Sequence, residues 1–187
     1  MRRTGLLGGS FNPAHAGHLH VAQAATRALR LHEAWLLVSP GNPLKPRAGM
    51  APFAQRLASA RAIARPPRLR ASDAEARLGT RFTVDTLERL RRRFPRRRFA
   101  LVIGADNLLQ LPRWRRWRGL VRAVPLAVLP RPGYTRPALR GAAASVMRRG
   151  RRRPAALMRA GSGWALVPAA ERAISATAIR SGALGVT

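Results

Sequence analysis

The sequence contains no cysteine, only 7 acidic residues against 36 basic ones, and no long apolar run. Without cysteine there is neither a disulfide framework, which would favour secretion, nor a thiol nucleophile. Without an apolar run of about 18 residues, no membrane-spanning helix is expected. The first residues hold no apolar signal region. We therefore expect a cytoplasmic protein, whose 187 residues are enough for one domain with a sizeable core.

The excess of positive charge is extreme, with a formal net charge of +29. Lys45 is the only lysine, and the other 35 basic residues are arginines. Such a balance raises the possibility of nucleic-acid binding, but no aromatic pattern of an RNA-binding module accompanies the arginine clusters. We interpret them as solvated surface residues that favour anionic substrates, and expect only adventitious binding of nucleic acid. An RNA-binding protein remains the alternative from a different class.

Strand-like and helix-like segments alternate along the chain, which is typical of parallel βαβ units. The pattern predicts an α/β protein: one doubly wound, Rossmann-like domain over residues 1–187 with a parallel sheet. The expected strands are residues 4–8, 34–38, 69–72, 99–103, 124–129 and 164–167. The expected helices are residues 17–30 and 53–64, a helix with Thr83 as its N-cap, and one starting near residue 175. Residues 137–160 are arginine-rich and poorly patterned, so we expect a surface helix and loop there.

The most informative stretch follows the first predicted strand and reads Gly8-Gly9-Ser10-Phe11-Asn12-Pro13-Ala14-His15-Ala16-Gly17-His18. Two adjacent glycines let the backbone approach a bulky anion. The following helix directs its free N–H groups and the positive end of its dipole to the same place. His15 and His18 add two side-chain donors. This combination indicates a triphosphate site.

Two other interpretations of this stretch exist. A glycine turn between a strand and a helix is common in any βα unit. His15, His18 and His20 could be zinc ligands, but there is no cysteine and no nearby carboxylate to complete a tetrahedral set. The full pattern, Pro13 included, is too specific for either, so we expect no metal held by protein side chains.

Further candidate residues follow other predicted strands. Lys45 lies in a Pro- and Gly-containing loop after the second strand and could close over a triphosphate. Asp106, just after Gly104 at the end of the central strand, could accept hydrogen bonds from ribose hydroxyls or cap a helix. Ligands of such sheets bind beyond the carboxyl ends of the strands, so these residues should converge with the histidine turn.

The segment Ile174-Ser175-Ala176-Thr177-Ala178-Ile179-Arg180 has the composition of a helix start. The hydroxyl of Ser175 or Thr177 and the first N–H groups of the helix can donate hydrogen bonds to a phosphate. One turn later, Arg180 adds a positively charged guanidinium group that can bind a phosphate with two hydrogen bonds. The alternative is an ordinary capped helix.

The two terminal motifs together resemble the signatures G-x-F-[DN]-P-x-H-x-G-H and [IS]-S-x-T-x-x-R of the nucleotidyltransferase superfamily. Three further segments occur in order between them. With these, the chain resembles the nicotinate-nucleotide adenylyltransferase family from residue 4 to residue 180. The segments are Arg81-Phe82-Thr83-Val84-Asp85-Thr86-Leu87, Ile103-Gly104-Ala105-Asp106-Asn107-Leu108 with Trp114 and Trp117, and Arg131-Pro132-Gly133-Tyr134.

The resemblance implies adenylyl transfer from ATP to nicotinate mononucleotide, in NAD biosynthesis, with Mg²⁺ accompanying ATP. His15, His18, Lys45 and Arg180 would be the catalytic residues. Residues that would bind ATP are Gly8, Gly9, Ser10, Phe11, His15, His18, Gly104, Asp106, Ser175, Thr177 and Arg180. Residues that would bind the nicotinate nucleotide are Thr83, Val84, Thr86, Trp114 and Arg115.

Elementary chemistry fits that substrate. A pyridine ring needs a flat aromatic partner, which Trp114 can provide, whereas Trp117 is expected in the core. N–H groups at the helix start around Thr83 and Val84, and at Arg115, can bind the nicotinate carboxylate. The alternatives within the superfamily are a nicotinamide-mononucleotide or a phosphopantetheine adenylyltransferase, and the oligomeric state stays open.

Overall fold

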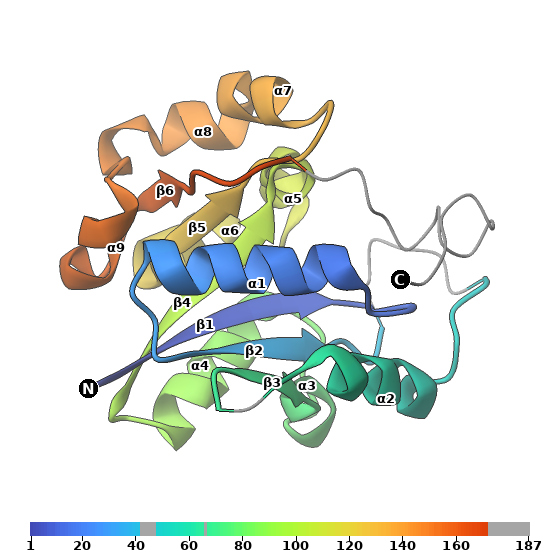
Figure 1. The fold of residues 1–187 in the computed structure, drawn as a ribbon. Helices are drawn as coiled ribbons and strands as arrows, with labels where there is room; N and C mark the ends of the chain where they lie inside the picture. Colours follow the sequence, from blue (N-terminus) through green and yellow to red (C-terminus); the bar gives the residue numbers. More distant parts are fainter. Residues whose placement is uncertain (42–47, 66, 172–187) are drawn as a thin grey trace.

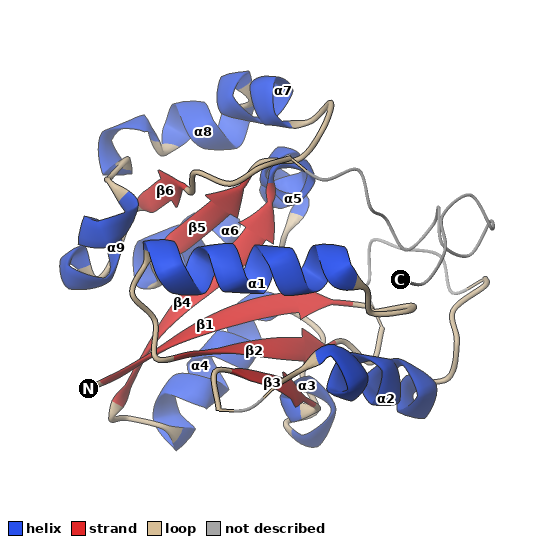
Figure 2. Cartoon of the chain, in the orientation of Figure 1, coloured by secondary structure: helices blue, strands red, loops and turns tan. Residues whose placement is uncertain are grey.

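The computed structural model describes residues 1–41, 48–65 and 67–171. Its centre is a sheet of six parallel strands in the order β3-β2-β1-β4-β5-β6, shown in Figure 2. The strands are β1 (Arg2–Gly9), β2 (Glu33–Val38), β3 (Leu69–Ser72), β4 (Arg97–Gly104), β5 (Leu126–Leu129) and β6 (Trp164–Leu166). The predicted doubly wound parallel sheet is therefore confirmed, and its switch point lies between β1 and β4, where the strand order reverses.

Helices cover both faces of this sheet (Figure 1). They are α1 (Ala16–Ala28), α2 (Phe53–Ile63), α3 (Ala74–Arg77), α4 (Thr83–Arg93), α5 (Ala105–Gln110), α6 (Trp117–Ala123), α7 (Thr135–Arg140), α8 (Ala142–Val146) and α9 (Pro154–Ala160). Two short 3₁₀ turns, Leu111–Arg113 and Arg148–Gly150, lie between them. None of the helices that the structure describes is both long and apolar enough to cross a membrane.

Alternation along the strands divides the core into two clusters. Successive side chains of a strand point to opposite faces, so Leu6 packs with α4, α5 and α6 on one face, while Leu7 packs with α1, α2 and α9 on the other. All six residues of β2 are buried, as are most of β4. Continuous apolar runs of this kind are typical of parallel strands covered on both sides, which explains why the sequence located these strands well.

Two expectations about local structure are wrong. The N-cap of α4 is Phe82 in extended conformation, and Thr83 is already helical. The carbonyl of Phe82 accepts hydrogen bonds from the N–H groups of Asp85 and Thr86. The backbone therefore turns one residue earlier than the hydroxyl pattern suggested.

Residues 137–160 are not a loose surface segment. They include part of α7 and all of α8 and α9, and small or flexible side chains of this segment are buried, with α7 and α8 packed mainly against α5 and α9 against β6. The buried residues are Ala138, Ala143, Ala144, Met147, Leu157 and Met158. Alanine contributes little to an apolar periodicity, and arginines occupy the exposed positions between these residues, so the pattern was weak.

Candidate active site

A cavity of about 330 Å³ lies at the switch point of the sheet. The carboxyl ends of β1, β4 and β5 form its floor, and the starts of α1 and α4 and the turn before α6 form its walls. It brings together predicted site residues from well-separated parts of the sequence: Gly8, Gly9, Ser10, Phe11, His15, His18, Thr83, Thr86, Gly104, Asp106, Trp114 and Arg115. The expected convergence at the carboxyl ends is therefore seen for these residues.

Among the predicted site residues that the structure describes, Val84 alone does not line the cavity. The side chain of Val84 is buried in the core, away from the cavity. Lys45, Ser175, Thr177 and Arg180 lie outside the described residues.

The two histidines form a reciprocal cap at the start of α1. His15 is the N-cap, and its Nδ1 accepts a hydrogen bond from the N–H of Gly17 at 3.1 Å. His18 Nδ1 accepts one from the N–H of His15 at 3.2 Å. A ring nitrogen that accepts such a bond carries no hydrogen, so the hydrogen of each ring resides on Nε2. The rings lie against each other with centroids 3.8 Å apart. Both histidines can therefore present an Nε2–H donor to a ligand in the cavity.

The environment keeps His15 uncharged. Burial, and secondarily the positive charge of Arg131, lower the pKa of His15 from 6.5 to about 4. At neutral pH the ring is therefore a neutral hydrogen-bond donor. Sequence reasoning identified the histidines as donors but did not foresee that they cap the helix that they precede.

The turn between β1 and α1 has an unusual backbone. Phe11 is 1% exposed and has φ of 47°, a left-handed conformation that is costly for a residue with a side chain. Its ring lies within 3.3 Å of where a Cβ on Gly9 would be, whereas a Cβ on Gly8 would meet nothing within 4 Å. Gly9 thus makes room for Phe11, and Gly8 leaves space at the end of β1.

Asp106 is the second distinctive polar group of the cavity. It lies in the first turn of α5, whose N-cap is Gly104 and not the aspartate. Oδ2 accepts a hydrogen bond from Arg131 Nη1 at 2.8 Å, while Oδ1 is buried and has no hydrogen-bond partner among the described residues. A Cβ on Gly104 would lie 2.4 Å from Oδ1. An unsatisfied buried carboxylate oxygen is costly, so this atom is suited to accept hydrogen bonds from a ligand.

The other end of the cavity is built by α4 and the turn that precedes α6. Trp114 is half-buried and lines the cavity, whereas Trp117 packs against the core without lining it. The Arg115 guanidinium lies over the ring of Phe82, 4.9 Å from its centroid, and its Nη1 is 3.7 Å from Asp85 Oδ2. Among the described residues, none accepts a hydrogen bond from the N–H of Thr83. Trp114 and Phe82 thus form an aromatic wall of the cavity beside the N-terminus of α4.

Sequence reasoning assigned no site role to several charged groups of the cavity, among them Arg131 and Glu75. Arg131 was quoted within a motif but given no role, although its position just after β5 was a usable signal. Glu75, after β3, lines the cavity and is 8% exposed. Burial raises the pKa of its carboxyl, partly opposed by hydrogen bonds with Ser39 and Thr86.

The cavity lining carries more positive than negative charge. Among the described residues, its arginines are Arg81, Arg113, Arg115 and Arg131, and its acidic residues are Glu75 and Asp106. Such a balance favours anionic ligands.

No described group of three or more histidine or acidic side chains could hold a metal ion. His20, considered above as a zinc ligand, instead makes a hydrogen bond of 3.0 Å between Nε2 and the carbonyl of Ala170.

A parallel sheet of this order, with a glycine and histidine turn at its switch point, defines a nucleotidyltransferase of the α/β class. The family model described as cytidylyltransferase-like matches residues 6–182.

A curated relative from Gluconobacter oxydans, named probable nicotinate-nucleotide adenylyltransferase, is 59% identical over 95% of this chain and 93% of its own length. One from Gluconacetobacter diazotrophicus with the same name is 55% identical over 97% and 86%. The chain belongs to the nicotinate-nucleotide adenylyltransferase family.

Solved structures agree on the fold. The Plasmodium falciparum nicotinic acid mononucleotide adenylyltransferase complexed with NaAD has a TM-score of 0.73, with 16% identity over 97% of this chain and 83% of that one. At such low identity the similarity establishes the architecture alone.

Proposed function

We propose a residue-level account of the reaction of this family, in which ATP and nicotinate mononucleotide give nicotinate adenine dinucleotide and pyrophosphate. A 5′-phosphate oxygen of the mononucleotide attacks the α-phosphorus of ATP. The bond from that phosphorus to the oxygen bridging to the β-phosphorus breaks in line, and pyrophosphate leaves with its electrons. The attacking oxygen is already anionic, so no general base or covalent intermediate is required. Positioning and charge stabilisation then supply most of the catalysis.

His15 and His18 are the proposed stabilisers of the α-phosphoryl group. The observation that carries this assignment is the reciprocal cap, which fixes both rings and leaves each hydrogen on Nε2. Two preoriented donors stabilise the charge that develops in the transition state without rearranging. The positive end of the α1 dipole adds to this effect.

Asp106 is the proposed ligand of the adenosine ribose, since its Oδ1 is buried without a partner and a ribose hydroxyl is a donor. Lys45, Ser175, Thr177 and Arg180, outside the described residues, remain proposals for the β- and γ-phosphates. Mg²⁺ prefers phosphate oxygens and water, and when bound with ATP it would neutralise phosphate charge.

The aromatic wall is the proposed pyridine site. Trp114 can stack on the ring, and the free N–H at the start of α4 can bind the nicotinate carboxylate together with the backbone at Arg115. The nicotinamide form lacks that negative charge and would lose part of this interaction.

The direct test mixes the purified protein with ATP, Mg²⁺ and either nicotinate or nicotinamide mononucleotide, and follows dinucleotide product by mass spectrometry. We expect a strong preference for the nicotinate form. Product only with the nicotinamide form would overturn the carboxylate site while keeping the mechanism. If neither acceptor reacted, phosphopantetheine would be tried next as acceptor, and the proposed reaction would be rejected. In parallel, Trp114→Ala should raise KM for the pyridine nucleotide more than KM for ATP.

A further inference from the structure

Arg56 differs from the other arginines of this chain. It lies in the second turn of α2 and is 3% exposed, and it is the only buried arginine in the part of the chain that the structure describes. None of the described acidic residues forms an ion pair with it. Arginine stays protonated in proteins, so α2 carries a buried positive charge without a carboxylate partner.

The Arg56 guanidinium is instead satisfied by four backbone carbonyls from three loop segments. Nη1 donates to the carbonyls of Ser10 and Ser39, both at 2.7 Å. Nε donates to the carbonyl of Ala51 at 2.9 Å, and Nη2 to that of Pro40 at 3.3 Å. The planar guanidinium group of Arg56 thus connects the turn after β1 with the loop after β2 and with the segment just before α2.

Two neighbours strengthen the same connection. Ser59, one turn after Arg56 on α2, accepts a hydrogen bond from the N–H of Ala14 at 3.1 Å. Its single hydroxyl hydrogen is shared between the carbonyl of Arg56, at 2.8 Å, and that of Phe11, at 3.3 Å. Asn12 Nδ2 donates to the carbonyl of Gly49 at 2.9 Å. Since Phe11 has a left-handed backbone, the turn requires such external support to keep its shape.

The contact with Ser10 has a specific consequence. A planar trans peptide directs its C=O and the next N–H to opposite sides. Holding the Ser10 carbonyl against Arg56 therefore also fixes the direction of the Phe11 N–H. Ser10 and Ser39 both line the cavity, and Ser10 is one of the residues expected to bind ATP. The buried charge of Arg56 therefore contacts residues of the cavity wall from the side away from the ligand. Carbonyl dipoles satisfy the N–H groups of Arg56 but leave its net charge in place.

We propose that Arg56 is a positioning residue for ATP: through its four carbonyl contacts it holds the turn after β1 in the triphosphate-binding shape, and its unpaired charge raises affinity for the triphosphate. It acts through Ser10 and Ser39 and does not itself need to contact the nucleotide. The inference rests on the proposed function for the identity of the anion.

The test compares Arg56→Gln with Arg61→Gln, which removes the same charge from an exposed position of α2. Binding of ATP without acceptor is measured by titration calorimetry, together with KM for each substrate and the melting temperature. For Arg56→Gln we expect ATP binding weakened about tenfold or more, as loss of about 1.4 kcal/mol implies, with KM for the mononucleotide nearly unchanged. Arg61→Gln should match the wild type.

A merely structural role would give a different result. It would lower the melting temperature and raise both KM values together, or leave the ATP affinity of the folded protein unchanged; either outcome overturns the proposal. If Arg56→Gln does not fold, Arg56→Lys takes its place. Lysine retains the charge but lacks the fork, so its ATP affinity should fall by a smaller factor, with binding of the mononucleotide unaffected. Because ATP binding is measured without acceptor, a failure of the proposed reaction would not be mistaken for a failure of this inference.

Discussion

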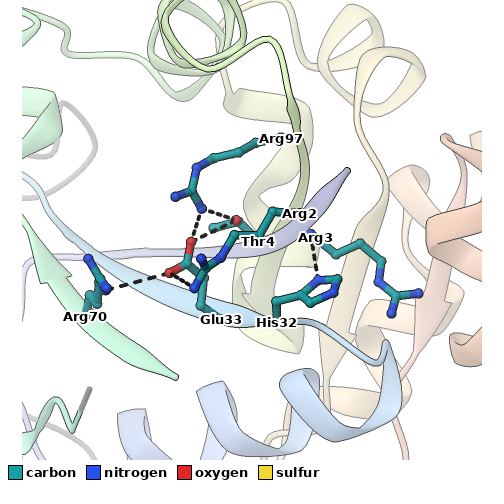
Figure 3. A network of polar contacts seen from close by, with 7 residues as sticks. All are labelled: Arg2, Arg3, Thr4, His32, Glu33, Arg70 and Arg97. Atoms are coloured by element: carbon teal, nitrogen blue, oxygen red, sulfur yellow. Dashed lines mark hydrogen bonds and ion pairs between the residues drawn. The ribbon is translucent and has the colours of Figure 1, made fainter. Parts of the chain in front are cut away.

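The two ends of the same sheet each carry a carboxylate, and its surroundings differ between the two ends. At the amino end, Glu33 is fully buried at the start of β2. Figure 3 shows it surrounded by Arg2, Arg70, Arg97 and Thr4. At the carboxyl end, Asp106 has one arginine, Arg131, and one oxygen that no described residue satisfies.

This difference indicates that Glu33 stabilises the fold, whereas Asp106 is available to a ligand. Arg97 also donates to Thr4 at 3.1 Å and lies over the Trp35 ring, 5.1 Å from its centroid. It therefore links three adjacent strands, β4, β1 and β2. Both carboxylate oxygens of Glu33 are thus engaged by described side chains. At the carboxyl end, by contrast, Oδ1 of Asp106 has no hydrogen-bond partner among the described residues, and His15 and His18 line the cavity beside it. Variants at the two ends should accordingly separate stability from activity.

The largest effect is expected at the carboxyl end, from His18→Ala. Loss of a preoriented donor that acts in the transition state should lower kcat by about 10²–10³-fold, with little change in KM for ATP. Steady-state kinetics measure both. His18→Gln is the matched control, because glutamine at this position can still complete the helix cap. It should restore stability without restoring kcat, and a wild-type kcat in His18→Ala would remove the catalytic role.

The opposite result is expected at the amino end, from Glu33→Gln. It leaves three arginines without their carboxylate, and breaking a buried ion pair costs about 3–5 kcal/mol. Since these arginines are partly exposed, we expect the free energy of unfolding to fall by roughly 2–3 kcal/mol. Urea unfolding measures this fall, and kcat/KM of the folded variant should match the wild type. A large loss of kcat/KM with unchanged stability would reverse the comparison.

A third effect follows from the lowered pKa of His15, about 4 in the folded protein against 6.5 ordinarily. Between these values the unfolded chain takes up a proton that the folded protein does not. The free energy of unfolding should therefore fall as pH drops from 6.5 toward 4, by roughly 2 kcal/mol in total, with no contribution from His15 above pH 6.5.

His15→Asn tests this dependence because asparagine is a good N-cap but does not titrate. The pH dependence of urea unfolding should be shallower in the variant over the same range. If the two profiles are parallel, the dependence belongs to another group.

The sequence predicted features whose signal is local, and missed those whose partners are distant. The runs of β2 and β4 are continuous and apolar, and the histidine turn carries its chemistry within a few residues, so both were located. Glu33 and Arg56 have no local signal of burial in the sequence, because Glu33 contacts Arg97, 64 residues later, and Arg56 contacts Ser10, 46 residues earlier. Long-range contacts of this kind leave no periodicity along the chain, and only the folded sheet shows that they bury a charge.

The smallest effect is expected from Asp106→Asn, which tests the comparison most directly because it is the same substitution of carboxylate by amide as at Glu33. The amide keeps the shape but weakens acceptance of a ribose hydroxyl and loses the charge that pairs with Arg131. We expect KM for ATP to rise about tenfold, the loss of about one charge-assisted hydrogen bond.

The unfolding free energy of Asp106→Asn should change by less than about 1 kcal/mol, because its pair with Arg131 is partly exposed. In the wild type, the buried oxygen of Asp106 that has no described partner lowers the free energy of unfolding. Asparagine reduces this penalty, because its amide carries no charge that must be desolvated. Stability in urea and KM for ATP are both measured on Asp106→Asn and Glu33→Gln. If Asp106→Asn lost as much stability as Glu33→Gln, both ends of the sheet would hold the fold in the same way, and Asp106 would lose its assignment to the ribose.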